Sequence, residues 1–218
     1  MIVGLLGFIG SGKGTAGQIL KDVGFQPMSF ASGVKDVTSV MFGWRRDWLE
    51  GDTDASRMWR EEPDEFWSKK FGRNFTPREA LQKLGTEVGR EIFHKNFWVD
   101  RLEKYIESEQ NYVITDCRFY NEMQFIHERG GILIEIERGV KPHWYHLAAR
   151  ANHGSVKEIN FMHNESGVHA SEWSWIGGNI DHTIQNNGTV EDLKRNLLKC
   201  LTQSYGANTI LELTQGAL

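Results

Sequence analysis

The feature that most constrains the fold of this chain is a glycine-rich segment near its start, Gly7 to Thr15, which reads GFIGSGKGT. It matches the pattern G-x-x-x-x-G-K of a phosphate-binding loop, although Gly14 stands where Ser or Thr is usual and Thr15 follows it. The apolar run Met1 to Gly7 predicts a strand buried on both faces, and the stretch from Lys13 to about Val23 predicts a helix. Strand, loop and helix in that order are the context that the motif requires.

A loop of this kind binds phosphate mainly through its backbone. Glycines let N–H groups turn inward, and the helix N-terminus adds about half a positive charge. The Lys13 ammonium would bind the β- and γ-phosphates, and Thr15 would reach a phosphate oxygen or a magnesium ion. The alternative, a glycine-rich turn beside a surface lysine, fits this context less well. The candidate nucleotide-binding residues are Gly7, Gly10, Ser11, Gly12, Lys13, Gly14 and Thr15.

The remaining apolar runs predict an α/β fold, because strands alternate with helices along the chain. Further strands are expected at residues 25–30, near a sheet edge because of Pro27, and at 112–115, 132–136 and 182–185. Helices are expected at 33–42, from Thr76 onward, and at 96–108, 119–129 and 189–202. We expect one P-loop NTPase-like domain over residues 1–218, a parallel sheet flanked by helices. Two excursions leave it: a partly helical insert at 31–75 and an irregular, glycine-hinged lid region at 142–178. The tail after Gly206 is expected to pack loosely.

Composition narrows the classes of partner. Lys and Arg number 25 against 29 Asp and Glu, a net charge of −4, which argues against general nucleic-acid binding. The apolar N-terminal run is far shorter than the roughly 20 residues of a membrane-spanning helix. We therefore expect neither nucleic acid nor a membrane as partner. Cys117 and Cys200 make no disulfide framework, which fits a cytoplasmic location.

A second candidate site follows the predicted strand at 112–115. Asp116 comes directly after it, Arg118 two residues later, and Glu122 one helical turn beyond. An acidic residue in this place holds magnesium or its waters in phosphoryl-transfer enzymes. A fixed guanidinium nearby would neutralise and align an acceptor phosphate. The alternative is structural, with Asp116 as a helix N-cap and Arg118 as its salt-bridge partner.

A third candidate lies on the helix that begins after Thr76. Thr76 as N-cap, Pro77 at the first position and Glu79 at the third predict a capping box. The apolar stripe of this helix would be Leu81, Leu84, Val88 and Ile92. A polar set recurs every four residues and comprises Arg78, Gln82, Thr86 and Arg90. It is either an ordinary solvated face or a contact surface, in which the Gln82 amide could pair with a base edge.

The loop ending G-K-G-T resembles that of nucleoside monophosphate kinases. Ordered blocks elsewhere make the resemblance more specific. They are FASGVKD from Phe30, REALQKLGT from Arg78, NFWV from Asn96, YVITDCRFYNEM from Tyr112, HASE from His169 and DHTIQNNGT from Asp181. Together they resemble the deoxynucleoside monophosphate kinases of tailed bacteriophages over Met1 to about Leu201.

This resemblance implies ATP-dependent, magnesium-dependent phosphorylation of a deoxynucleoside monophosphate (dNMP) to the diphosphate by in-line transfer. It also implies an acceptor-binding role for the insert, closure of the lid, association into homodimers and, for a phage-encoded chain, the host cell cytoplasm. The implied catalytic residues are Lys13, Asp116, Arg118, Arg138 and Arg150, the last two as lid cations. Magnesium would be held by Thr15 and Asp116. The implied substrate contacts are Phe30, Lys35, Asp36, Trp44, Arg78, Gln82, Thr86, Arg118, Glu122, His169 and Glu172.

Other features suggest weaker hypotheses. The insert tryptophans 44, 48, 59 and 67 are expected to form its own core, with Trp44 as the candidate for stacking on a base. The histidines of the lid region match no zinc spacing, and we expect them to be solvated, except for His169, which the resemblance pairs with Glu172. Two other functions stay open: a different small-molecule P-loop kinase, such as a dephospho-coenzyme A kinase, or a nucleotide-dependent switch.

Overall fold

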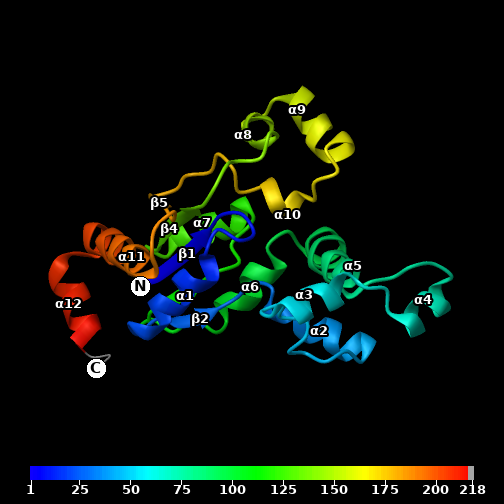
Figure 1. Cartoon of the computed structure of the whole chain (residues 1–218), viewed down its shortest axis with the longest axis horizontal. Coiled ribbons are helices and arrows are strands. Elements are labelled where there is room, and N and C mark those ends of the chain that lie inside the picture. Colours follow the sequence, from blue (N-terminus) through cyan, green and yellow to red (C-terminus); the bar gives the residue numbers. More distant parts are fainter. Residues whose placement is uncertain (216–218) are drawn as a thin grey trace. The chain divides into compact units, whose positions relative to one another are not determined.

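The computed structural model describes residues 1–215, which include a five-stranded sheet (Figure 1). The strand order is β2–β3–β1–β4–β5, and every neighbouring pair is parallel. The strands are β1 (Ile2–Leu6), β2 (Gln26–Met28), β3 (Tyr112–Ile114), β4 (Ile132–Glu137) and β5 (His182–Gln185). The predicted parallel α/β fold is confirmed, and β2, which contains Pro27, lies at an edge as expected.

The chain divides into two compact units, which we describe separately. The core unit comprises Met1–Ser29 and the chain from Ile106 onward, and it contains the whole sheet. The helical unit comprises Phe30–Tyr105, and therefore extends beyond the insert expected at 31–75. No helix among residues 1–215 is both long and apolar enough to cross a membrane.

Helices cover both faces of the sheet in the core unit. On one face, α1 (Lys13–Asp22) and α11 (Val190–Tyr205) contribute Leu20, Leu197 and their neighbours to a core shared with β1 and β4. On the other face, α7 (Tyr120–Glu128) approaches β1 so closely that a Cβ on Gly4 would lie 2.5 Å from Ile126 Cδ1. Because helices cover both faces of the sheet, every residue of β1 is buried, which explains its continuous apolar sequence.

The lid region contains several helices, so the prediction of irregular structure at 142–178 was wrong. It contains α8 (Tyr145–Asn152), α9 (Val156–Asn160), a short π-helix, η2 (Phe161–Glu165), and α10 (Ala170–Trp173). The tail was also mispredicted as loose, because α12 (Ala207–Gln215) follows Gly206 and its Ile210 is buried in the sheet core.

The helical unit has an aromatic core of its own, as predicted for the tryptophans. Its first helices are α2 (Ser32–Phe42), α3 (Asp54–Glu61) and α4 (Glu65–Phe71). The Trp44 ring stacks on Phe42 with centroids 4.6 Å apart, and Trp59 meets Trp44 edge to face. The Trp44 indole N–H donates to Asp64 at 2.8 Å, which satisfies the polar atom of this buried residue.

The helix after Thr76 changes type along its length. Thr76 caps α5 (Pro77–Gln82) by accepting from the Glu79 N–H, but the Glu79 carboxylate pairs with Arg73 rather than completing the predicted capping box. The chain then continues as a π-helix, η1 (Lys83–Phe93), before α6 (Phe97–Glu103). The wider π turn shifts the apolar stripe, and Ile92, predicted to be buried, is 72% exposed.

Candidate functional site

The phosphate-binding loop joins β1 to α1, and its glycines adopt backbone angles that other residues avoid. Gly7, Gly10 and Gly12 have φ values of 133°, 80° and 104°. A Cβ on Gly7 would lie 2.3 Å from the carbonyl oxygen of Ile136, so the end of β4 leaves no space for a side chain there. Gly14 and Thr15 are exposed in the first turn of α1, where backbone N–H groups lack helical partners. The loop therefore has the form that the motif predicts.

Lys13 lies across this loop. Its Nζ donates to the carbonyl oxygens of Gly7 at 2.6 Å and Phe8 at 2.9 Å. The pKa of the ammonium is lowered to about 8, mainly by burial and also by the nearby Arg118 charge, while Glu172 acts in the opposite direction. Lys13 therefore lies within electrostatic range of Arg118 and Glu172, both of which are far from it in the sequence.

Arg118 is held from two sides. Its guanidinium Nη1 donates to Glu172 Oε1 at 2.5 Å, which links the end of β3 to α10. Its backbone N–H donates to the Glu122 carboxylate at 2.7 Å, and the Phe119 N–H donates to the same oxygen at 3.0 Å. Glu122 is only 1% exposed and closes the first turn of α7, so it supports the backbone of Arg118. His169 accepts from the Ser171 N–H at 3.3 Å and so caps α10, the helix that carries Glu172.

Asp116 lies just beyond the carboxyl end of β3, as predicted. Its Oδ2 accepts from the Ser29 hydroxyl at 2.7 Å, and Ser29 follows β2, the neighbouring strand. The two side chains meet because parallel strands end at the same edge of a sheet. Sequence reasoning missed Ser29, because a single serine after a strand is a common turn residue.

The predicted lid cations differ in their surroundings. Arg138 is exposed directly after β4, near the edge where the phosphate-binding loop lies. Arg150 on α8 is 56% exposed and pairs through Nε with Glu158 of α9 at 3.0 Å. In this structure Arg150 therefore stabilises the lid region itself.

Three of the predicted substrate contacts in the helical unit form ion pairs there. Lys35 pairs with Glu50, and Asp36 accepts from Arg46 at 2.7 Å and from Arg101 at 3.0 Å. The remaining ion pair joins Arg78 Nε to Glu61 at 2.8 Å. The ion pairs of Lys35 and Asp36 hold the start of α2 in place. Arg78, the first residue of the polar set predicted on the helix after Thr76, therefore already has an ion-pair partner within the helical unit.

The other substrate candidates of the helical unit differ in exposure. Gln82 and Thr86 are half-buried, on α5 and η1 respectively. Phe30 is 2% exposed and Trp44 8% exposed. This burial argues against the stacking role considered for Trp44, because its ring belongs to the aromatic core.

A buried acid lies on β4, next to the strand that leads into the phosphate-binding loop. Glu135 is 4% exposed, and Leu6, its partner on β1, directly precedes Gly7. Burial and the charge of Glu137 raise the pKa of Glu135 to about 7. Hydrogen bonding to Lys141 lowers the pKa of Glu137, so Glu135 is the member of the pair that keeps a proton.

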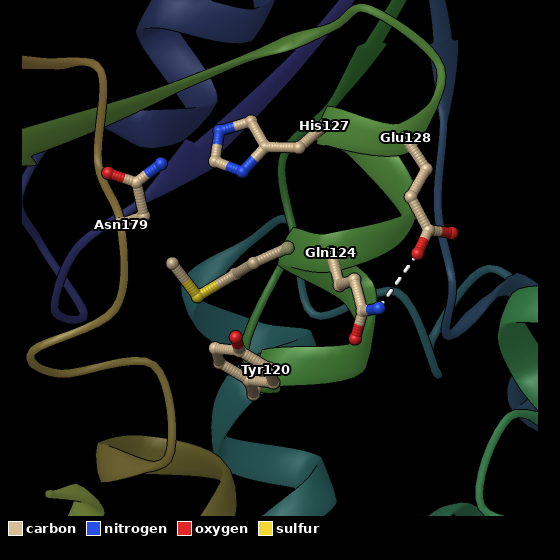
Figure 2. A pocket seen from close by; sticks show the side chains of 6 residues that line it. Tyr120, Gln124, His127, Glu128 and Asn179 are labelled. Atoms are coloured by element: carbon tan, nitrogen blue, oxygen red, sulfur yellow. Dashed lines mark hydrogen bonds between the residues drawn. The ribbon is translucent and has the colours of Figure 1, made fainter.

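A surface pocket of about 320 Å³ lies elsewhere, beside α7. Figure 2 shows the side chains around it, which include Tyr120, Gln124 and His127. His127 Nε2 is 2.8 Å from Asp181 Oδ2, the oxygen that also accepts from the Leu133 N–H at 2.8 Å. This contact ties α7 to the starts of β4 and β5. None of the predicted site residues lines the pocket.

Comparison with known proteins agrees with the predicted resemblance. A family model described as deoxynucleotide monophosphate kinase matches residues 50–197. A protein of Acanthamoeba polyphaga mimivirus, provisionally named deoxynucleotide monophosphate kinase, is 28% identical over 222 residues, covering 95% of this chain and all of that protein. The deoxynucleoside-5'-monophosphate kinase of Escherichia phage T5 is 42% identical over 55 residues, 24% of this chain and 22% of the phage enzyme.

Among solved structures, shikimate kinase from Aquifex aeolicus is similar at 17% identity, with a TM-score of 0.44 over 93% of this chain and 97% of that one. The family match covers more than half of the chain. The protein therefore belongs to the deoxynucleotide monophosphate kinase family.

Proposed function

We propose that this protein transfers the γ-phosphoryl group of ATP, with Mg²⁺, to the phosphate of a dNMP. The observation that supports this most is that the Lys13 ammonium contacts the carbonyls of the phosphate-binding loop and lies within electrostatic range of the Arg118 guanidinium. One cation belongs to the loop itself and the other follows a different strand. Two cations from separate elements can neutralise two anions, a donor triphosphate and an acceptor phosphate.

The proposed reaction needs positioning and charge neutralisation rather than a general base, because the acceptor phosphate oxygen is already ionised near neutral pH. The N–H groups of the loop and the first turn of α1 would bind the triphosphate of ATP. The Lys13 ammonium would exchange its contacts with the Gly7 and Phe8 carbonyls for the β- and γ-phosphates. Arg118 would hold the acceptor phosphate in line with the γ-phosphorus, which lowers the entropic part of the barrier.

The residues at the edge of the sheet fit the magnesium ion that this reaction class uses. Thr15 offers a hydroxyl at the start of α1, and Asp116 and Ser29 offer a carboxylate and a hydroxyl after β3 and β2. Hard oxygen ligands of this kind suit Mg²⁺, which is usually held by one or two carboxylates together with phosphates and water. When bound, the ion would neutralise charge that develops on the phosphate oxygens.

The ion pair between Arg118 and Glu172 suggests how acceptor binding and lid position are connected. Glu172 on α10 is the present partner of Arg118, and it belongs to the predicted lid region. An incoming acceptor phosphate would compete with the Glu172 carboxylate for the Arg118 guanidinium, so the position of α10 would depend on whether the acceptor is bound. Closure of a lid is needed because water would otherwise accept the phosphoryl group.

The remaining assignments are supported by the resemblance alone. Arg78, Gln82, Thr86, Lys35 and Asp36 of the helical unit are proposed to contact the acceptor. Arg138 and Arg150 are proposed lid cations, His169 a support for Glu172, and Glu122 a support for Arg118. The homodimer and the cytoplasmic location stay predictions, which sedimentation analysis and cell fractionation would test.

A coupled assay of ADP release with a panel of acceptors tests the proposal. We expect turnover only when a dNMP is added, with rates that differ among the four bases. Turnover with dephospho-coenzyme A alone would indicate a different P-loop kinase. Turnover that is equal with and without any acceptor would indicate a slow nucleotide-dependent switch.

A further inference from the structure

The loop after β5 makes a contact with the phosphate-binding loop that sequence reasoning did not assign. The side-chain amide of Asn186 donates from Nδ2 to the carbonyl oxygen of Ser11 at 2.8 Å, across 175 residues of sequence. Asn186 is 9% exposed, so this hydrogen bond is shielded from water. We propose that Asn186 is a positioning residue that sets the orientation of one N–H group in the phosphate-binding loop.

The geometry of a peptide bond explains how one contact can do this. The carbonyl of Ser11 and the N–H of Gly12 belong to the same planar trans peptide, so they point in opposite directions. When Asn186 holds the Ser11 oxygen on the outer side of the loop, the Gly12 N–H must point to the other side. An inward N–H is what a phosphate-binding loop needs.

Gly12 is fixed on its other side as well. Its carbonyl accepts from the Ala16 N–H at 2.9 Å, the first hydrogen bond of α1. Its φ of 104° requires glycine, and a Cβ there would lie 2.3 Å from Asn186 Nδ2. The close packing of Asn186 against Gly12 therefore depends on the absence of a side chain at Gly12.

Asn186 is itself well anchored, which makes it a suitable support. Its backbone N–H donates to the Glu137 carbonyl at 2.7 Å, directly after the last β4–β5 pair, Glu137 and Gln185. The end of β4 also contacts the loop through the Ile136 carbonyl beside Gly7. The ends of β4 and β5 thus form a rigid base on which Asn186 orients the Ser11–Gly12 peptide.

The inference rests on the proposed phosphate-binding role of the loop and adds a residue that acts through the backbone. A competing role for Asn186 and the loop after β5 would be direct contact with the base or sugar of the nucleotide. The two roles differ in what they predict for a ligand that has phosphates but no nucleoside. Inorganic tripolyphosphate is such a ligand.

The test uses Asn186→Leu, which keeps a similar volume but removes the donor, with Asn186→Ala as a second variant. The matched control is Asn187→Leu, the same change at the exposed neighbouring position. Binding of tripolyphosphate and ATP is measured by calorimetry, and the KM for each substrate by steady-state kinetics. Circular dichroism confirms that each variant is folded.

We expect the Kd for tripolyphosphate and the KM for ATP to rise together by about tenfold, as for loss of one hydrogen bond to a buried group. The KM for the dNMP should stay within about twofold of wild type, and Asn187→Leu should resemble wild type throughout. An unchanged Kd for tripolyphosphate in a folded variant would overturn the inference, whether or not ATP binding is lost. Equal losses for ATP and dNMP would also overturn it, because they indicate a general structural role. If the wild-type protein binds neither tripolyphosphate nor ATP, the proposed function fails first. If it binds ATP alone, an unchanged Kd for ATP in folded Asn186→Leu would overturn the inference.

Discussion

Raising the pH from 7 to 9 should weaken nucleotide binding about tenfold, because Lys13 loses its proton in this range. The pKa of the Lys13 ammonium is about 8, lowered mainly by burial and further by Arg118. Bound phosphates favour the charged form, so binding raises this pKa again. Above pH 8, binding must therefore be accompanied by uptake of a proton.

The magnitude follows from the protonated fraction of Lys13. With a pKa of about 8, that fraction falls from about 0.9 at pH 7 to about 0.1 at pH 9. The apparent Kd for ATP rises in inverse proportion, which corresponds to about 1.4 kcal/mol of binding free energy. Substitution of the two charged neighbours should move the midpoint of this pH dependence in opposite directions. Arg118→Ala should raise the pKa of Lys13, and Glu172→Gln should lower it.

Isothermal titration calorimetry in buffers of different ionisation enthalpy measures both the Kd and the number of protons taken up. We expect nearly one proton per ATP at pH 9 and almost none at pH 7. Lys13→Arg is the control, because a guanidinium stays charged over the whole range and its Kd should not change with pH. A wild-type Kd that changes less than twofold between pH 7 and 9, with no proton uptake, would refute the reasoning.

Three further predictions concern single residues. Lys13→Ala should abolish phosphoryl transfer while circular dichroism shows an intact fold, and a retained kcat would remove Lys13 from the reaction. Arg118→Ala should raise the KM for the dNMP at least tenfold more than the Kd for ATP, and equal losses would place Arg118 outside the acceptor site. Glu135→Gln should stabilise the protein by about 2 kcal/mol at pH 8 but not at pH 4. The native state keeps a proton on Glu135 up to about pH 7, so wild-type stability falls as pH rises from the unfolded value towards 7. Urea unfolding at both pH values measures this, and equal effects would contradict it.

The parallel sheet could be predicted because the buried strands β1 and β3 are continuous apolar runs and β4 is mostly apolar. The segment Tyr112–Ile114 is fully buried, as its composition indicated. The phosphate-binding loop was equally readable, because its glycines are demanded by the backbone angles of Gly7, Gly10 and Gly12. Information of this kind is local, so a single sequence carries it.

The lid helices could not be predicted, because their short segments carry too little local information. Segments as short as α9, Val156–Asn160, contain little more than one turn and show no reliable apolar period. The π-helix Lys83–Phe93 escaped notice because a four-residue spacing fits both helix types, and only its wider turn exposes Ile92.

The candidate site was predicted in part. Lys13 and Arg118 were identified from motifs, and their nearness to Glu172 is a property of the fold. Ser29 and Asn186 act through partners 87 and 175 residues away, and no spacing rule connects such pairs. Arg150 was chosen for its charge, but its partner Glu158 on the next helix could be found only in the structure.

The fate of the γ-phosphoryl group tests the central claim most directly. The protein is incubated with ATP labelled at the γ-phosphate and with each dNMP in turn, and the labelled products are separated by chromatography. The account predicts that the label appears in the deoxynucleoside diphosphate, and that Lys13→Ala abolishes this product. Label released only as inorganic phosphate, at a rate that does not depend on the dNMP, would contradict it.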